Sequence, residues 1–168
     1  MHRDPSSDDY LDHYRPPGSD ALGTVRICAS AHGITGIAFV DTADAPARPS
    51  ALTAAARQQL ADYFAGTRRI FDLPLAAAGT DFQQRVWAAL AAIPFGETRH
   101  YAEIAEQLHC KGGQRAVGAA NARNPLAIVV PCHRVIGSDG RLTGYAGGLG
   151  RKRWLLAHEA GEIPLELA

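Results

Sequence analysis

Apolar and polar residues alternate in a short stretch near the start of the chain, which is typical of a half-buried β-strand. Val25 and Ile27 lie on one face of residues 24–29, and an apolar stretch over residues 34–40 follows a glycine-containing turn. We expect these two stretches to form a hairpin. Residues 70–75 predict a further strand. Residues 1 to about 20 are polar, and we expect them to form a mobile tail.

Apolar residues elsewhere in the chain recur at the spacing of α-helices. Residues 50–64 predict a helix that Gly66 ends, and residues 80–93 predict a helix that begins with a capping-box sequence. Short helices over residues 101–108 and 114–123, separated by a glycine-containing turn, form the pattern of a helix-turn-helix. The same geometry also occurs as a plain scaffold. A last amphipathic helix contains residues 154–159.

These elements predict an α+β fold with two domains. Residues 1–79 form a small N-terminal domain of strands and one helix, with the mobile tail at its start. Residues 80–168 form a mostly helical C-terminal domain, and the seam falls at residues 76–79. A chain of 168 residues can build one sizeable core or two small ones. The first domain contains no candidate chemistry, so we expect it to play a supporting role.

Charge is balanced over the whole chain but not along it. The sequence has 17 Lys and Arg against 17 Asp and Glu, yet eight basic residues and one acid, Asp139, lie between Gln107 and His158. A local positive excess is typical of a surface that binds phosphates, although a solvated basic face has the same composition. The excess falls on the predicted helix-turn-helix, which favours a nucleic-acid partner.

The three cysteines Cys28, Cys110 and Cys132 are widely spaced and odd in number. This spacing fits neither a disulfide framework nor a Cys-x-x-Cys metal site, and free thiols fit a reducing cytosol. No apolar stretch has the length of a membrane span, and the polar N-terminus lacks a signal-peptide pattern. We therefore expect a cytoplasmic protein without a metal, a cofactor or a membrane partner.

The stretch Pro-Cys-His-Arg-Val at residues 131–135 carries the candidate chemistry. It follows an apolar run at residues 126–130, which we expect to be extended and buried. Cys132 is the candidate nucleophile, because a thiolate attacks alkyl-like carbon well once a base removes the thiol proton. His133 is the candidate base. Neighbours in an extended chain point to opposite faces, so a relay through water is easier than direct contact.

A glycine-rich loop at residues 144–150 follows this stretch. Its glycines let the backbone approach a flat ligand closely, and Tyr145 supplies an aromatic face for stacking. Glu159, on the last helix, can orient His133 as the acid of a catalytic triad does, although a surface carboxylate at this position is equally common.

Together these residues resemble the O6-alkylguanine-DNA alkyltransferase family. The resemblance rests on residues 131–135, on Asn124-Pro125 before them, and on Gly144-Tyr145 and residues 154–159 after them. It covers about residues 81–161. It implies a ribonuclease H-like sheet in the N-terminal domain and a winged-helix-like C-terminal domain with a helix-turn-helix. The implied reaction is irreversible, single-turnover transfer of an alkyl group from O6-alkylguanine in double-stranded DNA to a cysteine of a monomer. O4-alkylthymine is a second candidate substrate.

The resemblance implies a catalytic role for five residues. Cys132 accepts the alkyl group, His133 acts as its base through a water molecule, and Glu159 holds His133. Asn124 lies at the hinge that shapes the site. Tyr101 pushes the 3′ phosphate and can donate a proton toward N3 of guanine.

The resemblance also implies contacts with DNA or the substrate for five residues. Arg115 enters the base stack from the minor groove, where the damaged base was. Tyr145 forms the wall of the substrate site on which the base stacks, and Val135 lies on the opposite rim of that site. Ser138 contacts the substrate or the strand. Ala146 stands where some members carry serine, so a hydroxyl donor to O6 is missing.

Three other functions use parts of the same sequence. A damage-binding member of the family replaces the acceptor cysteine, and Cys132 argues against that function. A cysteine hydrolase leaves the basic helix-turn-helix unexplained. If the protein were a transcriptional regulator, residues 131–135 and 144–148 would have no role.

Overall fold

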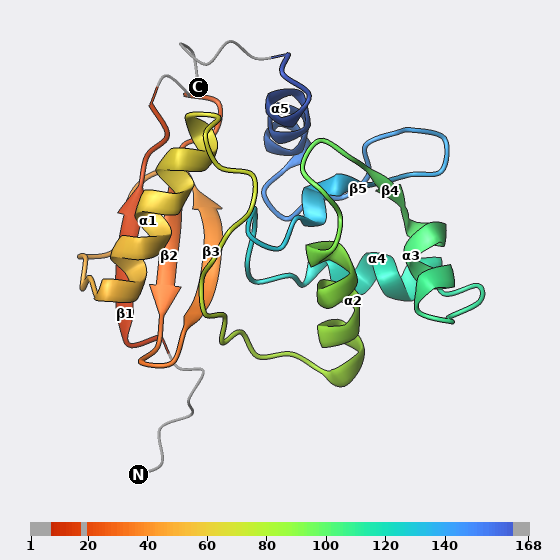
Figure 1. Cartoon of the computed structure of the whole chain (residues 1–168), viewed down its shortest axis with the longest axis horizontal. Helices are drawn as coiled ribbons and strands as arrows, with labels where there is room; N and C mark the ends of the chain where they lie inside the picture. Colours follow the sequence, from red (N-terminus) through yellow and green to blue (C-terminus); the bar gives the residue numbers. More distant parts are fainter. Residues whose placement is uncertain (1–7, 18–19, 163–168) are drawn as a thin grey trace. The chain divides into compact units, whose positions relative to one another are not determined.

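The computed structural model describes residues 8–17 and 20–162 and contains two compact units, Met1–Ala78 and Gly79–Glu162 (Figure 1). The fold is mixed α+β, as the sequence predicts, with the sheet in the N-terminal unit and most of the helices in the C-terminal unit.

The N-terminal unit is a three-stranded antiparallel sheet with one helix against it (Figure 1). Strands β1 (Tyr10–Tyr14), β2 (Thr24–Ala29) and β3 (Ile34–Val40) lie in the order β1-β2-β3, and the predicted hairpin of β2 and β3 is confirmed. Helix α1 (Ala51–Phe64) packs on the strands. The core consists of apolar side chains with almost no exposed surface: Val25, Ile27, Ile34, Ile37, Leu60, Tyr63 and Phe64.

Two helix starts follow the capping chemistry of their sequences. At the start of α1 the Ser50 side chain accepts a hydrogen bond from the backbone N–H of Thr53, and at the start of α2 Thr80 accepts one from Gln83. Each pair forms a reciprocal capping box, which satisfies two backbone N–H groups that lack partners inside the helix. These contacts explain why both helices begin where the sequence predicts.

Two predictions for the N-terminal unit were wrong. Residues 10–14 belong to β1 and pair with β2, whereas we expected them in a mobile tail. Their sequence is too polar to indicate a strand, and the ladder with β2 supplies the missing order. The rest of the predicted tail at residues 1–7 and 18–19 lies outside the described residues. Residues 70–75 form only an isolated bridge, at Leu75, because Pro74 has no N–H to extend a ladder.

The C-terminal unit consists of short helices around a two-strand parallel pair, β4 with β5. Its elements in chain order are α2 (Asp81–Ala91), β4 (Arg99–His100), α3 (Tyr101–Gln107), α4 (Gln114–Ala122), the 3-10 helix η1 (Cys132–Arg134), β5 (Val135–Ile136) and α5 (Leu149–Glu159). Helices α2, α3 and α4 pack on one another, and the indole N–H of Trp87 on α2 donates to the carbonyl of Ala120 on α4 at 2.9 Å.

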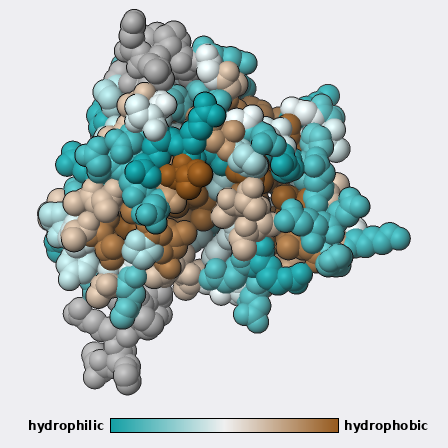
Figure 2. Space-filling model, in the orientation of Figure 1, coloured by the Kyte–Doolittle hydropathy of each residue, from teal (hydrophilic) through white to brown (hydrophobic). Residues whose placement is uncertain are grey.

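The predicted helix-turn-helix is present as α3, a turn and α4. Gly112 has φ of 73° in the turn, and the N–H of Gly113 donates to the carbonyl of Cys110 at 2.8 Å. Figure 2 shows hydrophilic side chains over this turn, where Lys111 is exposed. The turn of the motif is therefore polar, and Lys111 adds a positive charge to it.

Residues 126–130 are buried in part, as expected, but they form a turn instead of an extended segment. The N–H of Val130 donates to the carbonyl of Leu126 at 2.9 Å, and Ile128 has φ of 71°. A positive φ is unfavourable for a β-branched residue, so tertiary contacts must hold this turn. Within residues 8–17 and 20–162, no helix combines the length and apolar character that a membrane crossing requires.

Candidate functional site

The thiol of Cys132 is buried at the first residue of η1, with 4% of the residue exposed. Burial raises the pKa of Cys132, because the thiolate loses its hydration. The Asn124 side chain and the positive charge of Lys152 act in the opposite direction without cancelling the effect of burial. The resting sulfur is therefore a thiol, and nucleophilic attack requires a base.

The side chain of His133 lies against Glu159, as the sequence predicts for an orienting carboxylate. Its Nε2 lies 2.7 Å from Oε2 of Glu159, and both side chains are almost fully buried. A carboxylate only accepts hydrogen bonds, so Nε2 carries the proton and Nδ1 is the free acceptor. Burial lowers the pKa of His133, which keeps the ring neutral. Nδ1 is buried and has no protein partner, which suits a general base.

Glu159 is also bound by a buried arginine. Arg134 donates from Nε to Oε1 at 2.7 Å and from Nη2 to Oε2 at 3.0 Å, and its Nη1 donates to the carbonyl of Ile93 at 2.6 Å. Burial alone would raise the pKa of Glu159, but hydrogen bonds from His133 and Arg134 and the charge of Arg134 hold that pKa well below its usual range. Because His133 is neutral, Arg134 is the lasting counter-charge of this carboxylate.

Two asparagines at the end of α4 hold the peptide groups around Cys132. Asn124 donates from Nδ2 to the carbonyl of Val130 at 2.7 Å, and its Oδ1 accepts from the N–H of Leu126 at 3.0 Å. Asn121 donates a longer bond, 3.4 Å, to the carbonyl of Cys132. The two bonds of Asn124 close the turn before Cys132, whereas no feature of the sequence had selected Asn121.

Tyr101 and Arg115 line one cavity of about 340 Å³ beside α4. The hydroxyl of Thr143 donates to the hydroxyl of Tyr101 at 3.2 Å across this cavity. Gly118 and Ala122 also line it, so the small side chains of α4 leave room for close approach of a ligand. The complete lining set is Tyr101, Gln114, Arg115, Gly118, Ala122, Thr143 and Gly144.

The remaining predicted residues lie on β5 and the loop after it. Val135 is fully buried, and the Tyr145 hydroxyl is buried without a protein partner. Burial, and then the charge of Cys132, raise the pKa of Tyr145. Ser138 and Ala146 are exposed.

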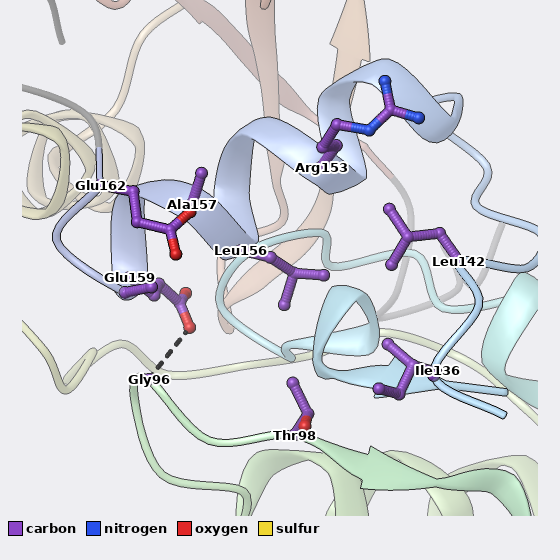
Figure 3. Close-up of a pocket in the computed structure, with 11 residues that line it drawn as sticks. Gly96, Thr98, Ile136, Leu142, Arg153, Leu156, Ala157, Glu159 and Glu162 are labelled. Atoms are coloured by element: carbon purple, nitrogen blue, oxygen red, sulfur yellow. Dashed lines mark hydrogen bonds between the residues drawn. The ribbon is translucent and has the colours of Figure 1, made fainter. Parts of the chain in front are cut away.

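A second cavity of about 380 Å³ lies beside α5. Figure 3 shows Leu142 and Leu156 around it and the carboxylate of Glu159 facing Gly96, whose N–H donates to Oε1 at 3.3 Å. Its lining includes none of Cys132, His133, Tyr101 and Arg115, so we do not assign the chemistry to this cavity.

The basic stretch is less uniform than its sequence indicates. Arg134 and Lys152 are buried and are not free to contact phosphates, which corrects the expectation that all eight basic side chains form one surface. Five are exposed: Lys111, Arg115, Arg123, Arg141 and Arg153. The spacing of Lys152, Leu155 and Glu159 along α5 is the signal that places Lys152 on the buried helix face. Among the described residues, no three His, Cys, Asp or Glu side chains are arranged to hold a metal ion.

Two family models match this chain. The one described as "6-O-methylguanine DNA methyltransferase, DNA binding domain" matches residues 81–161, and the one described as "6-O-methylguanine DNA methyltransferase, ribonuclease-like domain" matches residues 20–77. The fold and the buried thiol site thus define a protein with a DNA-binding-type helical domain and a ribonuclease-like domain. The chain belongs to the 6-O-methylguanine DNA methyltransferase family.

Characterised relatives are similar over most of the chain. The methylated-DNA–protein-cysteine methyltransferase of Mycobacterium tuberculosis is 47% identical over 161 residues, which is 92% of this chain and 96% of the relative. That of Salmonella typhimurium is 61% identical over 102 residues, 60% of each chain. The crystal structure of Mycobacterium tuberculosis OGT in complex with DNA matches with a TM-score of 0.79 and 46% identity, covering 88% of this chain and 92% of that one.

Proposed function

We propose that this protein repairs double-stranded DNA by moving the alkyl group of O6-alkylguanine onto the sulfur of Cys132. The observation that carries the proposal is a buried cysteine followed directly by a buried histidine whose Nε2 is held by Glu159 and whose Nδ1 has no protein partner. The substrate class is supported by a relative that is named methylated-DNA–protein-cysteine methyltransferase. It is also supported by the crystal structure of a similar protein in complex with DNA.

The reaction is a single displacement. Nδ1 of His133 takes the proton of Cys132 through a water molecule, the sulfur forms a bond to the alkyl carbon, and the bond from that carbon to O6 breaks. The electron pair of the broken bond goes to guanine, which takes a proton at N3 from Tyr101. Exchange with solvent restores the tyrosine proton and removes the proton from His133. The product is a thioether, which ordinary thiol reductants do not cleave, so each molecule acts once.

The damaged base must leave the helix to react. A thiol with 4% exposure is out of reach of a base inside a duplex, and extruding that base costs a few kcal/mol. Arg115 is exposed on α4 and can fill the space left in the stack, which offsets part of this cost. We place the entering base in the cavity beside α4, which Arg115, Tyr101 and Thr143 line, and its entry there would open the hydrogen bond from Thr143 to Tyr101.

The proposed division of labour follows the two domains. Residues 80–168 bind DNA and accept the alkyl group, and residues 1–79 support that domain. We also place the protein in the cytoplasm, because its three cysteines are free and the acceptor thiol needs a reducing compartment.

The single-turnover claim has a direct test. Protein is titrated with duplex DNA that carries O6-methylguanine, and the methyl groups lost from DNA are counted per protein molecule. We expect a plateau at one equivalent, and the C132A variant is expected to bind the same DNA without removing methyl groups. Continued removal beyond one equivalent, with release of methanol, would instead indicate a cysteine hydrolase.

A further inference from the structure

Asn121, near the end of α4, has a buried hydrogen-bond acceptor that the described protein groups do not use. The residue is 3% exposed and lies on the helix face that also buries Val117 and Ala120. Its Nδ2 donates to the carbonyl of Cys132 at 3.4 Å, whereas its Oδ1 has no hydrogen-bond partner among the described protein atoms. A buried amide oxygen without a partner costs free energy, and ordered water often satisfies such an atom.

The orientation of the Asn121 amide follows from its one partner. A carbonyl oxygen only accepts hydrogen bonds, so the amide NH2 group and not Oδ1 faces the carbonyl of Cys132. That carbonyl belongs to the peptide bond that joins Cys132 to His133. Since Oδ1 belongs to the same amide group as Nδ2, it lies beside the two residues of the proposed proton transfer.

His133 contributes a second buried acceptor of the same kind. Glu159 holds the proton on Nε2, which leaves Nδ1 as an acceptor without a partner among the described protein groups. A water molecule donates two hydrogen bonds, and it can also accept one from a thiol. One water therefore matches the two acceptors and the Cys132 donor, and three partners are typical of a buried water molecule.

We propose that Asn121 is a positioning residue for alkyl transfer, whose Oδ1 holds the water molecule that carries the Cys132 proton to His133. Before the transfer, the thiol donates to the water, and the water donates to Nδ1 and Oδ1. One proton then passes from sulfur to the water and another passes from the water to Nδ1. This inference rests on Cys132 and His133 acting as they do in the proposed function.

The bond to Oδ1 is the one that stays the same during the transfer. Afterwards Nδ1 donates to the water, and the water donates to the thiolate and still to Oδ1. Asn121 therefore keeps the water in place while its other two bonds reverse direction. Because the water then donates to the thiolate, we expect Asn121 to favour the ionised sulfur at neutral pH.

A crystal structure of the wild type that resolves ordered solvent tests the water site directly. We expect a water molecule within about 3.2 Å of both Oδ1 of Asn121 and Nδ1 of His133, in contact with the sulfur of Cys132. A structure without water at this position, or with a water that bonds only one of the two acceptors, overturns the proposal. This test needs no variant and no DNA.

The role of the water is tested by alkylating Cys132 with iodoacetamide across a range of pH, with peptide mapping to separate it from the other cysteines. In N121L we expect the rate at pH 7 to fall about tenfold, the effect of losing one hydrogen bond, and the pH profile to move to higher pH. N121S keeps an oxygen acceptor and is expected to lie between N121L and the wild type. Q58L removes an exposed amide on α1 and is the matched control.

The shift in the N121L profile reports on the water because the substitution removes no charge. The ionisable groups that act on Cys132 and His133 all remain in place: Arg134, Tyr145, Lys152 and Glu159. In the H133Q background, N121L should have no further effect, since both residues act through one water molecule. Additive effects of the two substitutions, or a wild-type profile in N121L, overturn the proposal. If N121L does not fold, N121A replaces it in both comparisons.

Methylated duplex DNA separates this inference from the proposed function. Asn121 does not line the cavity beside α4, so N121L should bind the DNA as the wild type does and transfer the methyl group about tenfold more slowly. A wild-type transfer rate in N121L overturns the role of Asn121. A wild type that holds the water and reacts with iodoacetamide, but never takes a methyl group from DNA, refutes the proposed function and leaves the water site valid.

Discussion

Arg134 and Glu159 form a bidentate ion pair in the interior of the C-terminal unit, with N–O distances of 2.7 and 3.0 Å. The same carboxylate accepts the Nε2 proton of His133 at 2.7 Å. The orientation of the proposed base therefore depends on a carboxylate whose ionised form depends on Arg134. Three predictions concern this network, and a fourth concerns the turn that precedes Cys132.

Replacing Glu159 with glutamine should impair the reaction and the fold together. The amide cannot neutralise Arg134, so we expect a loss of about 3–5 kcal/mol in the free energy of unfolding, as for other broken buried pairs. The tautomer of His133 is no longer imposed, so the single-turnover rate of methyl transfer should fall by about 100-fold. E162Q, at an exposed carboxylate three residues later, is the control and should match the wild type. Wild-type rate in E159Q would exclude the proposed role of Glu159.

Arg134 should support the stability of the fold, whereas Arg141 should support DNA binding. R134M leaves Glu159 buried without a cation and should lose about 3–5 kcal/mol of stability in urea unfolding. R141M removes an exposed guanidinium that pairs with the exposed carboxylate of Asp139, so its stability should stay within about 0.5 kcal/mol of the wild type. If R141M, unlike R134M, makes the affinity for DNA fall less steeply with rising salt concentration, the exposed basic side chains contact phosphates as proposed. A stable R134M protein would show that the buried pair is dispensable.

The stability of the C-terminal unit should fall as the pH drops below about 6.5. Burial lowers the pKa of His133 in the folded protein below the ordinary histidine value of 6.5, so the unfolded chain binds more protons than the folded one in this range. The free energy of unfolding therefore decreases as the pH falls. Chemical unfolding at pH 7 and pH 5.5 measures it, and H133Q should show a smaller difference than the wild type. H32Q, at an exposed histidine, should keep the wild-type difference.

Asn124 should stabilise the turn that presents Cys132. In N124A the carbonyl of Val130 and the N–H of Leu126 lose their side-chain partner, which should cost about 1–3 kcal/mol of stability. The thiol also loses the Asn124 contact that lowers its pKa, so iodoacetamide should react more slowly with Cys132 at pH 7. Unchanged reactivity in a folded N124A protein would contradict this account of Asn124.

The contact between His133 and Glu159, which we propose to be catalytic, was predictable because the two residues lie in a specific motif and on a periodic helix. Cys132 and His133 are neighbours in the sequence, and Glu159 follows at the end of the last helix, where the structure brings it to His133. The partners of these residues were not predictable in the same way. Arg134 and Lys152 are charged, and charged side chains are usually exposed, so we counted both with the surface.

The sequence did not predict strand β1 or the turn at residues 126–130, for the same physical reason. In both, contacts with other residues override the local pattern of apolar and polar positions. Strand β1 contains Asp12 and His13 and is ordered by its ladder with β2. The apolar run at residues 126–130 suits a strand by composition, but Asn124 closes it into a turn through two side-chain bonds. The helices α1 to α4 were predictable because caps and glycines mark their ends in the sequence.

The central claim is that the sulfur of Cys132 keeps the alkyl group. The most direct test is to react the protein with duplex DNA carrying O6-methylguanine, digest it, and locate the added methyl group by tandem mass spectrometry. We predict S-methylcysteine at residue 132 only, with C110A modified to the same extent as the wild type. A methyl group on Cys28 or Cys110, or an unmodified protein after the DNA has lost its methyl group, would contradict the account.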